Sequence, residues 1–183
     1  MNKRILVPAV TILLMAAILF GVSAGLSDVR AKNIQDEHVY MMRTLLPGSE
    51  NFVIEPYTGD DANIRSVHKA ENGFVVETVT YGYAGEITMM IGVSNEGTVT
   101  GLVIRDMSET LGLGRNALTD ADFLAQFLNT SGGVTVADTE SVDTVDAITG
   151  ATVTSKAIAR SVNSAVAVVT GADAASAATS WGG

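Results

Sequence analysis

The stretch that decides the fold of this 183-residue chain is residues 73–107, GFVVETVTYGYAGEITMMIGVSNEGTVTGLVIRDM. Three runs rich in β-branched residues, at 73–81, 85–94 and 98–107, are separated by short connections that contain glycine. A fourth such run, at 64–70, precedes them. Connections this short join antiparallel strands, because parallel strands need long crossovers. The sequence therefore predicts an antiparallel β-meander.

Apolar residues at helical spacing predict three helices outside this meander, at residues 29–46, 118–129 and 153–169. The first is expected to end at Pro47-Gly48 and the last at Gly171, because these residues stop helices. The middle helix is expected to take Thr119 or Asp120 as its N-cap. Its buried face is expected to hold Phe123, Leu124, Phe127 and Leu128. The predicted fold class is α+β, with flanking helices around the meander.

Residues 5–26 contain no charged side chain. As a helix they span roughly 33 Å, enough to cross a hydrocarbon core of about 30 Å. We expect a single transmembrane helix that contacts membrane lipid, with residues 1–4 in the cytoplasm because Lys3 and Arg4 are basic. The alternative is a cleaved signal peptide ending near residues 22–24, although its apolar region is typically only about 7–15 residues long.

The remainder is expected to consist of a connecting helix at 27–48, an extracytoplasmic domain at 49–171 and a tail at 172–183. All 20 acidic residues but only nine of the 11 basic ones lie beyond residue 26, so this part has a formal net charge of −11. Such a charge argues against nucleic acid as a partner. The absence of cysteine excludes disulfides, iron–sulfur clusters and thiolate zinc sites. With two histidines, no metal site is expected.

The segment DAITGATVTSKAIARSV, residues 146–162, carries the chemistry. A chain that enters a helix near Thr154 leaves unsatisfied N–H groups and the positive end of a helix dipole, which suit a phosphate. Gly150 and Ala151 are small enough for a bulky group to approach the backbone. Four hydroxyl groups lie nearby, on Thr149, Thr152, Thr154 and Ser155. An ordinary capped helix start would have the same composition, so these features alone leave both interpretations open.

The order of residues in this segment resembles the flavinylation motif Asp-x-x-(Ser/Thr)-Gly-Ala-Thr of the FMN-binding domain family; the matching positions are Asp146, Thr149, Gly150, Ala151 and Thr152. Within that family the chain most resembles the G subunit of Rnf complexes and the related C subunit of the sodium-pumping NADH:quinone reductase. A flavin transferase in these systems transfers FMN from FAD to the last threonine through a phosphoester bond. The resemblance implies FMN on Thr152, with Thr154 and Ser155 beside it, and Asp146 in the signature that the transferase reads.

A second segment, SETLGLGRNAL at 108–118, resembles the Glu-Thr-Pro-Gly-Leu-Gly loop that lines the flavin in the same family. Leu111 stands where the family has proline, which loosens the preset geometry of the loop. The resemblance implies flavin contacts for Glu109, Thr110, Leu111, Gly112 and Leu113. Read without the resemblance, the segment is a glycine-containing connector after a strand. Tyr81 and Tyr83 are further candidates, because either ring would stack on a flavin or pack on the core.

The expected function is that of a membrane-anchored, covalently flavinylated electron carrier without catalysis of its own. The resemblance implies the G subunit of an Rnf-type ion-translocating ferredoxin:NAD⁺ oxidoreductase, with the other subunits of that complex and a flavin transferase as partners. One alternative is a carrier that works outside any such complex, and another is a C-type subunit of the sodium-pumping reductase. A non-redox binding module, in which the threonine-rich turn only caps a helix, is the third.

Overall fold

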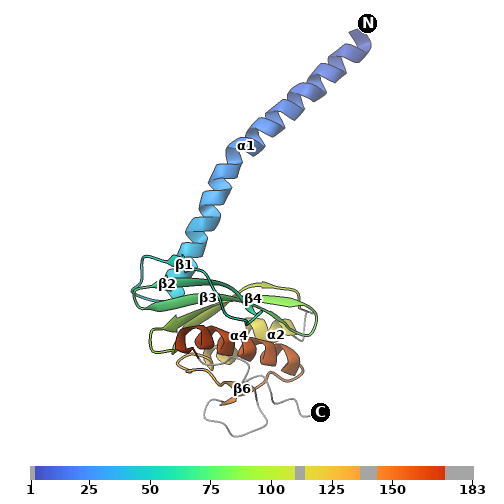
Figure 1. Ribbon diagram of the computed structural model, residues 1–183. Helices are drawn as coiled ribbons and strands as arrows, with labels where there is room; N and C mark the ends of the chain where they lie inside the picture. The colour runs from blue at the N-terminus through green and yellow to red at the C-terminus, as the bar shows by residue number, and fades with distance from the viewer. Residues whose placement is uncertain (1–2, 110–113, 137–143, 172–183) are drawn as a thin grey trace. The chain divides into compact units, whose positions relative to one another are not determined.

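The computed structural model describes residues 3–109, 114–136 and 144–171. The chain divides into two compact units, Met1–Tyr40 and Met41–Gly183. The second unit contains the β-sheet and the remaining helices, and the site described below lies within it (Figure 1). Residues 110–113, in the segment predicted to line the flavin, and the predicted tail at 172–183 lie outside the described residues.

The first element is one helix, α1 (Lys3–Leu45), so the helix predicted at residues 29–46 continues directly from the apolar segment before it. Large apolar side chains are exposed along the first unit, among them Leu13, Leu19 and Phe20. Within the described part of the chain, no helix is long and apolar enough to cross a membrane. The transmembrane helix predicted at residues 5–26 is therefore not confirmed.

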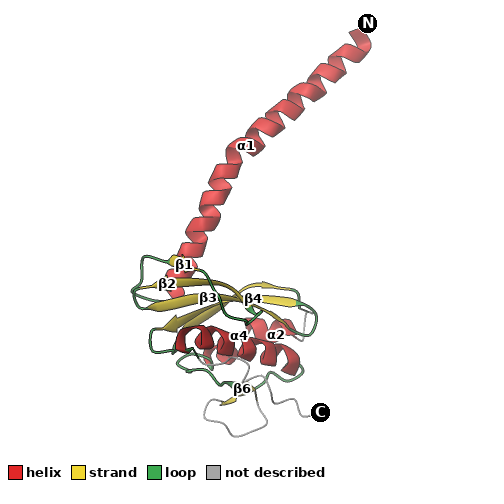
Figure 2. Cartoon of the chain, in the orientation of Figure 1, coloured by secondary structure: helices red, strands yellow, loops and turns green. Residues whose placement is uncertain are grey.

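The central feature of the second unit is a five-stranded antiparallel sheet in sequential order (Figure 2). Its strands are β1 (Val53–Glu55), β2 (Ile64–Ala70), β3 (Gly73–Tyr81), β4 (Glu86–Ser94) and β5 (Val99–Met107). The predicted meander is confirmed, with strand starts within one residue of those expected. The short edge strand β1 was not predicted, because three residues give too little alternation to recognise.

Alternation along β4 determines which helix covers each face of the sheet. Ile87, Met89, Ile91 and Val93 are fully buried and belong to the same apolar core as the long C-terminal helix α4 (Thr152–Thr170). Gly92 faces the other way, because successive side chains in a strand alternate. There it lies against the backbone of Leu45, at the end of α1. The sheet is thus packed on one face by α4 and on the other by the last turn of α1.

The helix predicted at residues 118–129 is wrong in its extent. The structure has two short helices instead, α2 (Gly114–Thr119) and α3 (Ala121–Ala125). Asp120 separates them as the N-cap of α3, and its side chain accepts the N–H of Phe123 at 2.9 Å. After α3 the chain continues in tighter i→i+3 turns and stops at Asn129, whose φ is 64°. Phe127 is fully buried as predicted, whereas Leu128 is 39% exposed.

Two further short strands, β6 (Thr135–Val136) and β7 (Thr144–Val145), pair in parallel. From β7 the chain passes through residues 146–151 into α4. The predicted stop at Gly171 is confirmed: its φ is 68°, and its N–H donates to the Ala167 carbonyl at 2.9 Å. Asn163 in α4 exchanges two hydrogen bonds of 2.9 Å with the backbone of Val134, which ties the helix to the segment before β6.

Candidate functional site

A tight turn leads into α4. The N–H of Ala151 donates to the Ile148 carbonyl at 2.9 Å, and Gly150 has a φ of 81°. These features match a type II turn, whose third residue needs a positive φ and is therefore usually glycine. The hydroxyl of Ser155 accepts the N–H of Ile148 at 3.4 Å. The turn is thereby held against the first turn of the helix it precedes.

The helix begins at Thr152, two residues before the entry at Thr154 that the sequence suggested. Its N-cap, Ala151, makes no side-chain cap bond, because alanine has no acceptor. The first intrahelical bond of this end runs from the Ser155 N–H to the Ala151 carbonyl, at 2.9 Å. The N–H groups that precede Ser155 have no i→i−4 carbonyl to bond, which leaves the positive end of the helix dipole uncapped.

The four hydroxyls of this segment lie in two environments. Thr149 and Thr152 are exposed, whereas Thr154 and Ser155 are fully buried. The last two are buried by tertiary packing, although Thr154 still lines the pocket described below. Thr149 and Thr152 are the two that an external enzyme can reach.

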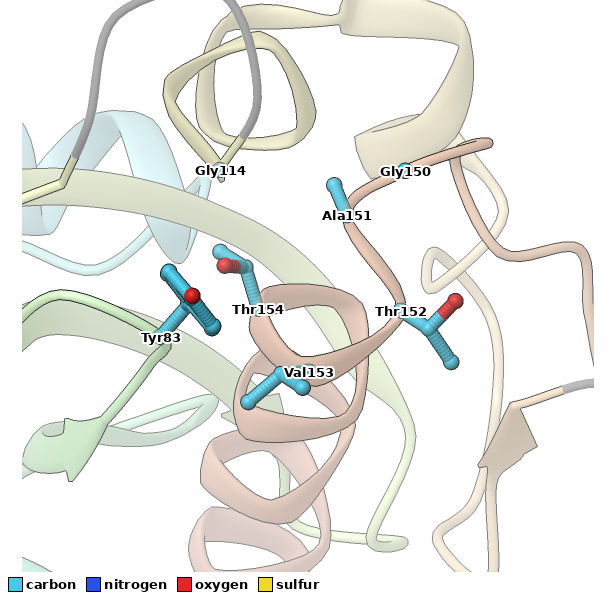
Figure 3. Close-up of a pocket in the computed structure, with 7 residues that line it drawn as sticks. All are labelled: Tyr83, Gly114, Gly150, Ala151, Thr152, Val153 and Thr154. Carbon is cyan, nitrogen blue, oxygen red and sulfur yellow. The ribbon is translucent and has the colours of Figure 1, made fainter.

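A pocket with a volume of about 240 Å³ opens beside this turn, lined by Tyr83, Gly114, Gly150, Ala151, Thr152, Val153 and Thr154. It joins three segments that are distant in the sequence: the β3–β4 turn, the start of α2 and the start of α4 (Figure 3). In Figure 3 the Thr152 side chain points away from Tyr83 and Thr154. Thr152 therefore lies at the edge of the pocket.

The two candidate tyrosines differ in their positions. Tyr83 lines the pocket and is 72% exposed, so one of its faces is available to a ligand. The Tyr81 hydroxyl instead donates to the Glu86 carboxylate at 2.8 Å. That hydrogen bond, reinforced by the charge of Glu86, raises the pKa of Tyr81 above its ordinary value. The structure thus brings Tyr83 to the site and leaves Tyr81 outside the pocket lining.

Glu109, the first residue of the predicted flavin loop, does not line the pocket but lies against Gly114, which does. Its Oε1 accepts the Ala84 N–H at 3.2 Å. Its Oε2 is buried and has no hydrogen-bond partner among the described residues. The carboxylate sits between two glycines, because a Cβ added at Gly82 or at Gly114 would overlap it. The other predicted loop residues, Thr110, Leu111, Gly112 and Leu113, lie outside the described residues.

Asp146, the first residue of the motif, is exposed and is not part of the pocket lining. Its backbone N–H donates to the side chain of Gln126 at 2.9 Å. Sequence reasoning did not identify Gln126 or Val153. Neither belongs to the motif pattern, and only the folded chain brings Gln126 to residue 146.

The comparisons with known proteins bear on this geometry directly. Residues 82–167, which include every residue that lines the pocket, match the FMN-binding domain family. The chain is 33% identical over 179 residues to the G subunit of the ion-translocating oxidoreductase complex of Methanosarcina acetivorans, an alignment covering 89% of this chain and 92% of that protein. The chain belongs to the family of G subunits of ion-translocating oxidoreductase complexes. The resemblance expected from the motifs is confirmed.

Two other G subunits match about half of the chain. The G subunit of the proton-translocating ferredoxin:NAD(+) oxidoreductase complex of Clostridium ljungdahlii is 37% identical over 99 residues, 53% of each chain. The G subunit of the Na(+)-translocating ferredoxin:NAD(+) oxidoreductase complex of Acetobacterium woodii is 39% identical over 102 residues, 52% of this chain and 48% of that protein. The crystal structure of Shewanella oneidensis NqrC aligns with a TM-score of 0.47 at 20% identity, over 69% of this chain and 67% of that one.

The residues of the pocket fit the FMN group that the family implies. The uncapped start of α4 offers backbone N–H groups to a phosphate. Small residues, Gly114, Gly150 and Ala151, form much of the lining and leave room for a flat ring. Glu109 Oε2 and Thr154 Oγ1 are buried polar atoms that lack a partner among the described residues. Such atoms in a native protein call for a ligand, an ion or a water molecule to satisfy them.

Proposed function

We propose that this chain carries FMN covalently on Thr152 and passes electrons within a membrane-bound ferredoxin:NAD⁺ oxidoreductase complex that translocates ions. The observation that carries the proposal is the exposed Thr152 at the uncapped start of α4, beside a pocket inside the FMN-binding domain. When bound, FMN supplies the redox chemistry, and the protein contributes attachment, orientation and electrostatic tuning.

The attachment step that we propose is a phosphoryl transfer from FAD. The Thr152 hydroxyl oxygen bonds to the phosphorus on the FMN side of FAD, and the pyrophosphate bond breaks with AMP as the leaving group. The flavin transferase supplies the base that takes the hydroxyl proton. Exposure favours Thr149 and Thr152 over the two buried hydroxyls. Thr152 is favoured over Thr149 because it lies in the first turn of α4, where the helix dipole and the free N–H groups stabilise a phosphate.

Three other residues have proposed roles toward the bound group. Gly150, with its positive φ, keeps the turn tight and lets the phosphate approach the backbone. Tyr83 offers an exposed aromatic face beside the pocket, on which a flavin ring would stack. Asp146 stays exposed on the motif and is available to the transferase.

The proposal includes a membrane anchor at residues 5–26, based on the lack of charged residues there and on Lys3 and Arg4 before it. Residues 27–48 then connect the anchor to the FMN domain, 49–171, outside the cytoplasm. Covalent attachment suits a cofactor in that location, since FMN lost there would not be replaced from the cytoplasmic pool. The anchor contacts lipid, and the domain contacts the other subunits of the complex.

The test is the mass of the full chain after co-expression with a flavin transferase and denaturation. Wild-type protein and Thr152→Ser are expected to gain the mass of one FMN less water, together with flavin absorbance that persists in denaturant. Thr152→Ala is expected to gain neither. Thr152→Ser is the matched control, because it keeps an exposed hydroxyl at the same position. Added mass on Thr152→Ala, or none on the wild type, would contradict the assignment.

A further inference from the structure

The charges of the domain are unevenly distributed around the pocket. Residues 49–171 contain 16 acidic and six basic residues, a formal net charge of −10. Two helices depart from this average: α2 contains Arg115, α4 contains Lys156 and Arg160, and neither helix contains an acidic residue. These two helices lie next to each other (Figure 1), and their first residues line the pocket. Half of the basic residues of the domain are therefore on the two helices that border the pocket.

Two exposed arginines lie beside two different segments of the pocket lining. Arg115 directly follows Gly114, which lines the pocket. Arg160 reaches from α4 to the end of β3, where its guanidinium donates to the Tyr81 carbonyl at 3.1 Å. That bond holds its charge two residues before Tyr83, which also lines the pocket. A guanidinium has five N–H donors, so Arg160 keeps donors for a partner.

Two carboxylates near these arginines already bind groups of the domain. Glu109 accepts the Ala84 N–H at 3.2 Å, and Glu86 accepts the Tyr81 hydroxyl at 2.8 Å. The side chain of Arg115, in contrast, has no hydrogen bond or ion pair to any described residue.

The pocket lining next to these charges exposes an aromatic and an aliphatic side chain. Tyr83 is 72% exposed and Val153 is 49% exposed. We call the surface formed by Tyr83, Val153, Arg115 and Arg160 the pocket mouth. Aromatic residues and arginine are the types enriched in protein–protein interfaces. The composition of the pocket mouth is thus that of a surface that binds another protein.

We propose that the pocket mouth is the docking surface for an acidic face of another subunit of the complex, the one that exchanges electrons with the bound flavin. The inference rests on the proposed function, because it takes the flavin to occupy the pocket. The arginines attract an acidic face, whereas the net negative charge of the rest of the domain repels it, so the encounter is oriented toward the pocket. The transferase instead has to reach Thr152, whose side chain points away from Tyr83 (Figure 3).

The first test is the rate at which the flavin is reduced in the assembled complex, in membranes, as reduced ferredoxin is oxidised. The variant Arg115→Glu/Arg160→Glu reverses the two charges. The matched control is Arg65→Glu/Lys69→Glu, which changes the net charge by the same amount in β2, outside the pocket lining. We expect the first variant to be slower than the wild type by about tenfold at low ionic strength, and the control to keep the wild-type rate. The difference should shrink toward about 1 M salt, where the Debye length is about 3 Å.

The second test identifies the partner face in the same complex. The variant Arg115→Lys/Arg160→Lys keeps both charges and introduces amines that a carbodiimide couples to a carboxylate. The amide bond forms with loss of water, which the carbodiimide takes up to become a urea. We expect crosslinked peptides that join position 115 or 160 to an aspartate or glutamate of another subunit. Lys69, in β2, is the internal control and should form no such link.

A wild-type reduction rate in the charge-reversed variant, or crosslinks to no other subunit, would overturn the docking surface and leave the attachment at Thr152 standing. Where the charge-reversed variant does not assemble, the crosslinks decide alone, because the lysine variant keeps the charges. The denatured mass of each variant reports flavin loading separately. Slower loading with an unchanged reduction rate of the loaded flavin would assign the arginines to the transferase and overturn the inference. A wild-type chain that carries no flavin mass would overturn the proposed function itself.

Discussion

The hydroxyl oxygens of Thr80 in β3 and Ser161 in α4 lie 3.0 Å apart, buried between the sheet and the helix. The Thr80 hydroxyl also reaches the Ala157 carbonyl, at 3.3 Å. A buried hydrogen bond between side chains is uncommon, since most side-chain bonds go to backbone or water. This one joins the sheet to the helix whose first turn contains Thr152. The position of that turn beside the pocket depends on such contacts.

The first prediction concerns this bond. Thr80→Val alone should lower the free energy of unfolding by about 1–3 kcal/mol, because it leaves the buried Ser161 hydroxyl without its Thr80 partner. Ser161→Ala alone should lower it by less, because the Thr80 hydroxyl still donates to the Ala157 carbonyl. The double variant should lose less than the sum of the two, since its core contains no orphaned partner. Urea unfolding measures all three. Thr78→Val is the control and should be neutral or slightly stabilising, because its hydroxyl has no partner among the described residues to lose. A double variant whose loss of unfolding free energy equals the sum of the two single losses would show that the two hydroxyls are not coupled.

The second prediction concerns two glycines that pair across β4 and β5, Gly92 and Gly101. A Cβ at Gly92 would overlap the carbonyl oxygen of Leu45, which also accepts the Thr100 hydroxyl. A Cβ at Gly101 would meet Leu45 only at 3.2 Å. Gly92→Ala should therefore destabilise by about 1–3 kcal/mol through overpacking, and Gly101→Ala by less. The midpoints of denaturant unfolding, compared at the same m-value, give the relative stabilities of the two variants. A lower stability for Gly101→Ala than for Gly92→Ala would contradict the packing of the last turn of α1 on this face.

The third prediction separates the effect of backbone strain on stability from the effect of the turn before Thr152 on flavinylation. Alanine at Gly150 must adopt a φ of 81°, and alanine at Gly133 a φ of 70°. Each variant should lose about 1–2 kcal/mol, the penalty for a left-handed L-residue. Gly150→Ala should also slow flavinylation because it distorts the turn before Thr152, whereas Gly133→Ala should be flavinylated at the wild-type rate. Thermal unfolding and the time course of flavin mass give the two readouts. Equal flavinylation rates in the two variants would show that Gly150 is not required for attachment of the flavin.

The fourth prediction concerns pH. The Asn51 side chain donates to Glu71 at 2.9 Å, and this bond lowers the pKa of Glu71 from its ordinary value of 4.5. The stabilisation is therefore present above about pH 4.5 and is lost as pH falls through the lowered pKa. Asn51→Ala should melt below the wild type near about pH 7, and the two melting temperatures should converge by about pH 3. A gap that persists or widens in acid would mean that the bond does not favour the ionised carboxylate.

The strands were predictable because β-branched residues alternate over seven to nine positions and glycine marks each turn. The N-cap at Asp120 was predictable, but the extent of the helix predicted at 118–129 was not, since its apolar spacing continues beyond Ala125, where α3 ends. The sequence predicted a start for α4 that is later than the observed one, for a related reason. Thr152 and Val153 have modest helix propensity, and Ala151 gives no capping signal.

The site was predictable only where it is local in sequence. The resemblance of residues 146–152 to the family motif proposes Thr152, and the loop that begins at Glu109 is a second candidate segment, of which the structure places Glu109 beside Gly114. Burial of Thr154 and Ser155, the selection of Tyr83 over Tyr81, and the contact of Gln126 with residue 146 all depend on tertiary packing. No local pattern encodes those contacts, because the partners lie in elements that meet only in the folded chain.

The most direct measurement of the central claim is the fragmentation spectrum of the peptide that trypsin releases from the flavin-loaded chain between Arg115 and Lys156. That peptide contains Thr149, Thr152 and Thr154 together with five other threonines. We expect one FMN phosphoester, located by fragment ions on either side of Thr152. The same mass on Thr149 or Thr154, or a peptide without it, would contradict the attachment at Thr152.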